Sequence, residues 1–414
     1  MVKFRPFRAI RPKEDYAADV AALPYDVMTS DEARTMVHDK PLSFLHIDKA
    51  EIDLPPGTDP YSDAVYAKAK ETLERQIREG VFIQDESPNF YVYRLTMNGR
   101  TQTGLVGCAS IDDYKENAIK KHELTRADKE EDRVRHVDSL DANTGPIFLA
   151  ARKDAGLSAV LEKAVLKEPI YDFIADDGVR HEVWVLDNTE KEDVVAVFEG
   201  TGALYIADGH HRCASAARVG EKRRQQNPGY TGDEEFGFFL AVVFPEEQLE
   251  ILDYNRVVAD LNGMTKEEFL SKLDKVMEIK PLENPGPAKP MHTHSFGMYL
   301  DGSWYLLEAR PGTFDETDYV RRLDVSVLQE NVLSPILGIE DPRTDKRIDF
   351  VGGIRGLAEL ERRVNSDMKV AFAMYPTSME ELFDIADAGL IMPPKSTWFE
   401  PKLRSGLFIH KLSD

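Results

Sequence analysis

Five consecutive residues, Asp208-Gly209-His210-His211-Arg212, carry groups that suit a bound anion. The apolar run 203–206 before them predicts a buried strand, and the small residues 214–217 after them predict a helix that begins near His211. Gly209 permits close backbone approach, and a helix start offers unpaired N–H groups and the positive end of the helix dipole. Two imidazoles and a guanidinium add donors for phosphate oxygens. The sequence therefore predicts a phosphate-binding turn, in which Asp208 could cap the helix, hold Mg²⁺ or accept a proton.

A plainer interpretation of the same turn treats Asp208 as a helix cap, one histidine as a core residue and Arg212 as a surface ion-pair partner. Two adjacent histidines and an arginine within five residues after a strand favour the functional interpretation. A zinc site is disfavoured, because adjacent histidine side chains diverge on a helix and no third ligand stands at a fixed short spacing.

A second group of chemically capable residues is Lys121-His122-Glu123-Leu124-Thr125, followed by Asp132-Arg133 and His136. On a helix these charges could simply form solvated ion pairs of small worth. The functional alternative makes Glu123 a general base. In that case Lys121, His122 or Arg133 would neutralise charge near a phosphate. The sequence leaves both alternatives open.

Two further segments are weaker candidates for ligand contact. Tyr25 and Asp26 follow Pro24 near the N-terminus, and Lys395 and Ser396 follow two prolines near the C-terminus. Prolines fix φ, so the second segment is expected to be a rigid loop that either docks on the protein or touches ligand. No Walker A pattern and no Gly-x-Ser-x-Gly elbow occurs in the sequence.

The elements that would position these groups indicate a mixed α/β or α+β protein. The dipeptide Asn98-Gly99 lies between two apolar runs, 90–95 and 103–108, and predicts a hairpin. The run 111–140 is highly charged and predicts one or two exposed helices. Other expected helices cover 61–80, 265–276 and 325–333, strands cover 237–244, 303–307 and 370–374, and a loop covers 283–290. We expect three regions, 1–110, 111–262 and 263–414, with the Asp208 turn in the central one.

Composition narrows the functional classes. The 414 residues include 74 Asp and Glu against 52 Lys and Arg, a formal net charge of -22 that disfavours binding to nucleic acid or anionic membranes. The two cysteines, Cys108 and Cys213, lie far apart and predict neither a disulfide framework nor a zinc knuckle. The absence of a signal peptide and of long apolar runs leads us to expect a soluble, cytoplasmic protein.

The chain resembles the bacterial family catalogued as domain of unknown function 1015. The motifs that carry this resemblance are Pro24-Tyr25-Asp26-Val27, Lys121-His122-Glu123-Leu124-Thr125, Asp132-Arg133, Ala207-Asp208-Gly209-His210-His211-Arg212 and Met392-Pro393-Pro394-Lys395-Ser396-Thr397. The Asp-Gly-His-His-Arg turn also resembles the ParB/sulfiredoxin superfamily, whose free-serine kinases carry the same string and use a glutamate elsewhere as base. His210 stands where sulfiredoxin has its essential cysteine, and Cys213 lies on the wrong side of Arg212 to replace it. The resemblance therefore implies a ParB/sulfiredoxin-like core with kinase rather than reductase chemistry.

Together the residues and the resemblance predict a nucleotide-binding phosphotransferase that acts on a small molecule, with free serine as the suspected acceptor and ATP or ADP as the donor. Glu123, Asp208 and His211 are the expected catalytic residues, and Asp208 would also hold Mg²⁺. The expected phosphate-binding residues are Gly209, His210, His211, Arg212, Lys121, His122 and Arg133. Hydrolysis of a phosphomonoester such as phosphoserine and ligand sensing without turnover remain alternatives. The expected partner is a nucleotide or another small phosphate-bearing molecule, and the sequence leaves formation of a homo-oligomer open.

Overall fold

The computed structural model describes residues 1–282 and 286–413. The chain divides into two compact units, Met1–Leu249 together with the C-terminal segment from Pro401, and Glu250–Glu400. The boundaries at 249/250 and 400/401 differ from the expected 110/111 and 262/263. Strand β5 (Arg100–Ser110) pairs with one strand that precedes it in the sequence and with another that follows residue 110, so the sheet joins the first two expected regions. Among the described residues, no helix combines the length and apolar character needed to cross a membrane.

The first unit is built on a nine-stranded mixed sheet in the order β6-β11-β8-β12-β5-β4-β10-β9, with β1 paired to β5. The predicted hairpin is confirmed: strands β4 and β5 pair, and Asn98 and Gly99, which both have positive φ, form the turn between them. The strands of this sheet are β1 (Phe4–Arg5), β4 (Tyr91–Met97), β5, β6 (Ile119–Lys120), β8 (Ile147–Ala151), β9 (Tyr171–Ile174), β10 (Arg180–Val185), β11 (Leu204–Asp208) and β12 (Phe238–Pro245). Two small strand pairs lie outside the sheet. In one, β2 (Ile10–Pro12) pairs with β3 (Phe82–Gln84), and in the other β7 (Ala142–Asn143) pairs with β21 (His410–Lys411).

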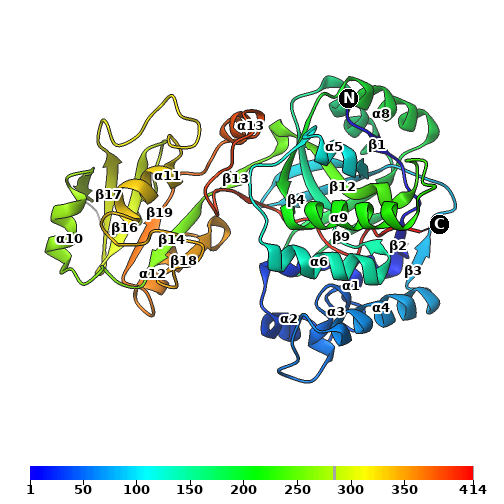
Figure 1. The fold of residues 1–414 in the computed structure, drawn as a ribbon, viewed down its shortest axis with the longest axis horizontal. Helices are drawn as coiled ribbons and strands as arrows, with labels where there is room; N and C mark the ends of the chain where they lie inside the picture. Colours follow the sequence, from blue (N-terminus) through cyan, green and yellow to red (C-terminus); the bar gives the residue numbers. More distant parts are fainter. Residues whose placement is uncertain (283–285, 414) are drawn as a thin grey trace. The chain divides into compact units, whose positions relative to one another are not determined.

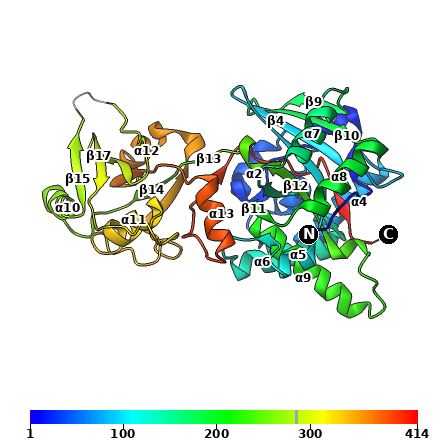
Figure 2. The same ribbon diagram turned by 90° about the horizontal axis from the view of Figure 1, so that it is seen from above.

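Some helices of the first unit pack against this sheet, whereas the helix Asp63–Arg78 packs against the helix Ala127–Leu140 (Figure 1). The helices of this unit are α1 (Ala17–Val20), α2 (Ser30–Met36), α3 (Leu45–Asp48), α4 (Asp63–Arg78), α5 (Ile111–Lys115), α6 (Ala127–Leu140), α7 (Ala155–Ala164), α8 (Asn188–Gly200) and α9 (His210–Gln226). Helices α6 and α9 lie side by side, as both views show (Figures 1 and 2). This pairing brings the segment after β6 to the helix that follows β11.

The charged run 111–140 is less exposed than expected. It forms α5, β6 and α6, and α6 buries Asp132, Arg133 and His136. These polar groups are buried because they have partners: the Tyr66 hydroxyl donates to Asp132 at 2.8 Å, and Asp132 pairs with Arg133 at 2.8 Å. The expectation of one or two exposed helices was therefore wrong for α6, which buries one of its faces.

The second unit has a six-stranded antiparallel sheet in the order β15-β17-β16-β19-β14-β18, and the mixed α/β class expected for the chain is confirmed. Its elements are β13 (Ile251–Leu252), β14 (Tyr254–Val258), α10 (Lys266–Leu273), β15 (Met277–Pro281), β16 (Ser295–Leu300), β17 (Ser303–Ala309), α11 (Asp324–Leu328), a π-helical turn (Gln329–Leu333), β18 (Ile348–Gly352), α12 (Leu357–Val364), β19 (Val370–Ala373), α13 (Met379–Asp387) and β20 (Trp398–Phe399). Of the expected loop 283–290, residues 283–285 lie outside the described residues.

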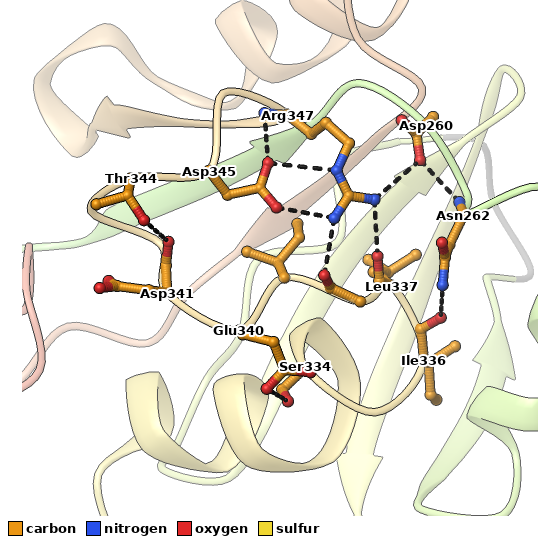
Figure 3. A network of polar contacts seen from close by, with 12 residues as sticks. Asp260, Asn262, Ser334, Ile336, Leu337, Glu340, Asp341, Thr344, Asp345 and Arg347 are labelled. Carbon is orange, nitrogen blue, oxygen red and sulfur yellow. Dashed lines mark hydrogen bonds and ion pairs between the residues drawn. The ribbon is translucent and has the colours of Figure 1, made fainter.

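One arginine holds the long irregular segment before β18. The guanidinium of Arg347 pairs with Asp345 at 2.8 Å and donates to the carbonyl oxygens of Leu337 at 3.0 Å and Gly338 at 2.8 Å (Figure 3). Asn262, just after β14, donates to the Ile336 carbonyl at 3.3 Å. Polar backbone of a loop needs such partners when it packs on a sheet, so this network has a structural role.

Candidate functional site

The turn between β11 and α9 has the predicted strand-turn-helix form. Pairing of β11 with β8 shifts register between Ile206 and Asp208, and such a bulge re-aims the side chain at the strand end. Gly209 has φ 95°, in the left-handed region that disfavours residues with a Cβ. A Cβ at this position would also lie 3.1 Å from Nε of Arg212. The backbone conformation therefore favours glycine, and a larger residue would also make the Arg212 side chain shift.

The structure brings the 121–126 loop to this turn. Strand β6 pairs in parallel with β11, so the chain leaves both strands at the same edge of the sheet. The backbone N–H of Arg126 donates to Nε2 of His211 at 3.0 Å, and the N–H of His122 donates to Nε2 of His210 at 3.5 Å. The rings of His122 and His210 meet edge to face, with centroids 4.5 Å apart. The two segments predicted to carry chemistry are therefore in direct contact.

Tautomers follow from these hydrogen bonds. Because Nε2 of His211 accepts, its neutral imidazole carries the proton on Nδ1 and is a donor at that atom. Burial lowers the pKa of His122 to about 4, although the nearby Asp208 acts in the opposite direction. Burial, aided by His122, likewise holds the pKa of His210 well below its ordinary value. His122 and His210 are therefore neutral at pH 7.

Glu123 lies beside these rings. One carboxylate oxygen of Glu123 and one ring nitrogen from each of His122 and His210 all lie within 4.8 Å of one another. Sequence spacing offered no third metal ligand next to the two adjacent histidines, but the fold supplies candidates from the 121–126 loop. The arrangement can accept a proton from a bound hydroxyl or, after small side-chain shifts, hold a divalent cation.

Asp208 is paired with a residue that the sequence did not single out as part of the site. Lys402, from the C-terminal segment, donates to Oδ2 of Asp208 at 3.1 Å, and Nη2 of Arg212 lies 3.9 Å from the same oxygen. Burial alone would raise the pKa of Asp208, but Lys402 and Arg212 outweigh it and hold this pKa below its ordinary value. Lys402 is buried, as are Arg404, Ser405 and His410 in the same tail, and a buried lysine needs a partner such as Asp208.

Arg212 turns inward, toward a small enclosed cavity. Its Nη1 donates to the Pro146 carbonyl at 2.6 Å, while its Nε is buried without a hydrogen-bond partner. The cavity has a volume of about 20 Å³, enough for roughly one water molecule. Its lining includes Tyr25, Asp48, Arg133, His136, Thr144 and Arg212.

Tyr25 lines this cavity, whereas the neighbouring Asp26 is exposed. The guanidinium carbon of Arg133 lies 4.0 Å from the centroid of the Tyr25 ring. Burial raises the pKa of the Tyr25 hydroxyl, so the tyrosine stays neutral. Burial opposes the charge of Arg212, but Asp26 and Asp208 more than compensate and raise its pKa. Sequence reasoning omitted Asp48, which accepts from Thr144 at 2.9 Å.

Lys395 and Ser396 lie in the second unit. Lys395 has φ 59°, its carbonyl accepts from Arg256 at 3.0 Å, and the Ser396 hydroxyl donates to the Pro393 carbonyl at 2.7 Å. These contacts make the loop rigid, as its prolines indicate. Contact of Lys395 or Ser396 with ligand stays a prediction.

Comparisons with known proteins give one family and several distant structures. The family model described as "Protein of unknown function (DUF1015)" matches residues 4–326. Comparison with curated proteins produced no match. A free serine kinase variant in complex with AMP shares 13% identity over 72% of this chain and 90% of its own, with a TM-score of 0.37. A conserved hypothetical protein from Pyrococcus furiosus shares 15% identity over 72% of this chain and 92% of its own, with a TM-score of 0.36. C-terminally truncated SbnI from Staphylococcus aureus shares 12% identity over 72% of this chain and 85% of its own, with a TM-score of 0.37. At TM-scores below 0.5 these likenesses carry no argument about the site, whose chemistry follows from its own geometry.

Proposed function

The chain belongs to the DUF1015 family, a family of unknown function, and we propose that it binds a nucleotide at the 208–212 turn and transfers a phosphoryl group from it to a small molecule. One observation carries this proposal. The carboxylate of Glu123 lies within 4.8 Å of a ring nitrogen of His210, which is the first residue of α9. A proton acceptor therefore stands beside the end of a helix that favours anions.

Binding would use the start of α9 and the donors around it. The helix N-terminus offers backbone N–H groups, and Nδ1 of neutral His211 is a further donor. The net charge of -22 would repel a nucleotide unless positive charge gathered locally. Lys121 and Lys402 supply such charge near Asp208 and His210, while Arg133 and Arg212 lie deeper, by the small cavity.

In the proposed step, a hydroxyl oxygen of the acceptor attacks the terminal phosphorus of ATP or ADP. A new P–O bond forms to the acceptor, the bond to the leaving nucleotide oxygen breaks, and the hydroxyl proton passes to Glu123. His210 and His211 are neutral imidazoles, so they would donate hydrogen bonds to the transferred group without offsetting its charge. Gly209 lets the phosphate approach the backbone. Free serine is the proposed acceptor.

Mg²⁺ would accompany the nucleotide, since it prefers oxygen ligands and is usually shared with phosphates. Asp208 is ionised and therefore in its ligating form, but Oδ2 already accepts from Lys402 at 3.1 Å. We assign the second oxygen of Asp208 to the ion, with phosphate oxygens as its other ligands. Lys402 would then fix the orientation of the carboxylate.

A second candidate function is supported by the grouping of His122, Glu123 and His210. Two imidazoles and one carboxylate are a ligand set typical of catalytic zinc, which lowers the pKa of bound water. The reaction would then be hydrolysis of a phosphomonoester such as phosphoserine. A chelator would inactivate both candidates, so zinc content separates them: the kinase contains no zinc and regains activity with Mg²⁺, whereas the hydrolase contains zinc and needs it to regain activity.

The direct test replaces Glu123 by glutamine, which keeps size and hydrogen bonding but cannot accept the proton. Turnover of ATP or ADP with serine should fall by roughly 10²–10⁴-fold while nucleotide affinity is kept. Glu116→Gln is the matched control. Glu116 is exposed and directly follows α5, and its substitution removes the same negative charge as Glu123→Gln. Wild-type turnover by the Glu123 variant would exclude Glu123 as the base.

A further inference from the structure

A surface groove runs along α9, beyond the turn. It has a volume of about 440 Å³ and is lined by residues of α5, α6 and α9, among them Tyr114, Glu130, Ala214, Ala217 and Arg218. Small-molecule sites typically occupy about 300–1,000 Å³. The groove is therefore of ligand size, whereas the cavity of about 20 Å³ beside Arg212 is not.

Helical periodicity connects the groove to the phosphate turn. Residues three and four apart lie on one face of a helix, so Ala214 follows His210 and His211, and Ala217 and Arg218 follow Ala214. From His210 to Ala217 the helix rises about 10 Å. This is comparable to the extended length of a nucleoside joined to its phosphates. A ligand anchored at the start of α9 would thus extend into the groove.

The loop that carries Glu123 also borders the groove. Nζ of Lys121 lies 5.2 Å from the centroid of the Tyr114 ring, on one side. On the other side, the Thr125 hydroxyl donates to Glu130 at 2.7 Å. The 121–126 loop therefore contacts two residues that line the groove, Tyr114 and Glu130, and also contacts the start of α9.

The chemistry of the lining suits a nucleoside. Ala214 and Ala217 present a floor of methyl groups that leaves room for a flat ring, and Tyr114 provides an aromatic wall. The rim is polar and internally paired: Arg218 binds Glu130 at 3.1 Å, and Lys115 binds Glu221 at 2.8 Å. Carboxylates at the rim can accept hydrogen bonds from ribose hydroxyls or a base amino group.

We infer that this groove binds the base and ribose of the nucleotide whose phosphates lie at the 208–212 turn. The inference rests on the proposed nucleotide binding, and it adds a nucleoside subsite on α9 with Tyr114, Ala214 and Ala217 as its determinants. A protein segment seated in the groove is the competing occupant. Such a segment would bind without any nucleoside, and its affinity would not depend on the 208–212 turn.

The test compares ligands that use different parts of the site. ADP, adenosine and inorganic pyrophosphate are titrated calorimetrically into the wild-type chain, Ala217→Leu, which fills the floor, and Tyr114→Leu, which removes the aromatic ring. Ala159→Leu is the matched control on an exposed position of α7. Loss of a base–aromatic contact typically weakens binding about ten-fold or more, so ADP affinity should fall by that factor in both groove variants. Pyrophosphate affinity should not change.

Each other outcome has a defined meaning. Unchanged ADP affinity in both groove variants overturns the subsite. An equal loss of ADP and pyrophosphate affinity also overturns it, because the weaker binding would then come from disturbed packing of α9. If the wild-type chain binds adenosine through the groove but not pyrophosphate, the subsite stands and the proposed phosphate turn falls. If it binds none of the three ligands, both proposals fail. Circular dichroism melting of each variant checks that the fold is kept.

Discussion

Substitution of Lys402 should show how much the C-terminal segment contributes, through its ion pair with Asp208, to the free energy of unfolding of the first unit. In Lys402→Met the chain keeps most of the apolar stem but loses the ammonium that lies 3.1 Å from Asp208 Oδ2. At that distance the attraction is about 5 kcal/mol for an effective dielectric constant near 20, before desolvation is subtracted. Breaking a buried pair costs about 3–5 kcal/mol. Because Arg212 remains 3.9 Å from the carboxylate, we expect about 2–3 kcal/mol here.

A double-mutant cycle separates this pair from simple packing loss. Asp208→Asn alone should also destabilise, because it leaves the Lys402 ammonium buried without its carboxylate, whereas the double variant should cost clearly less than the sum. The coupling expected at pH 7 is about 2 kcal/mol. Since the folded-state pKa of Asp208 lies below its ordinary value, the stabilisation is present above that ordinary value and is lost as the pH falls through the folded-state pKa.

The assay is urea unfolding, monitored by the hydrogen exchange of peptides from the first unit. Peptides from Glu250–Glu400 serve as the internal control. Both substituted residues belong to the first unit, so exchange in peptides of the second unit is expected not to change. Additive costs of the two single variants at pH 7 would refute the account of Asp208 as a carboxylate held by Lys402.

Other predictions concern binding, backbone strain and pH. His211→Ala removes a donor worth about 1.5–3 kcal/mol to a phosphate, so ADP affinity measured by calorimetry should fall about ten-fold or more; unchanged affinity would exclude His211 from the site. Gly209→Ala should lower the unfolding free energy by about 1–2 kcal/mol, because φ is 95° there; a neutral effect on urea unfolding would contradict the left-handed turn. Burial raises the pKa of Asp324 in the second unit to about 8, from an ordinary value of 3.8. The folded state should therefore lose stability as the pH rises between about 4 and 8, and Asp324→Asn should flatten that dependence in thermal melts from pH 5 to 9, whereas wild-type behaviour in the variant would rule Asp324 out as its source.

Features that depend on neighbouring residues could be predicted from the sequence. The left-handed Asn98-Gly99 turn and the strand-turn-helix around Gly209 follow from local rules on glycine, strand composition and helix starts. The contact between the 121–126 loop and α9 does not follow from local rules, since 85 residues separate Arg126 from His211. The ParB/sulfiredoxin-like detail of the core stays a prediction.

Tertiary pairing explains what the sequence could not supply. Lys402 reaches Asp208 across 194 residues, through a tail that returns to the first unit after an inserted one. Charge patterning placed α6 on the surface, but Asp132 is buried under the Tyr66 hydroxyl, a partner invisible to periodicity. Likewise, no spacing rule brings Glu123 to within 4.8 Å of His210.

The central claim is tested most directly by phosphorus NMR of the chain with ATP or ADP, Mg²⁺ and serine. The account predicts a new phosphomonoester resonance that grows with the wild-type chain, and none with Glu123→Gln under conditions where calorimetry shows that variant still binding nucleotide. A wild-type chain that neither shifts the nucleotide resonances nor forms any new phosphate species would contradict it.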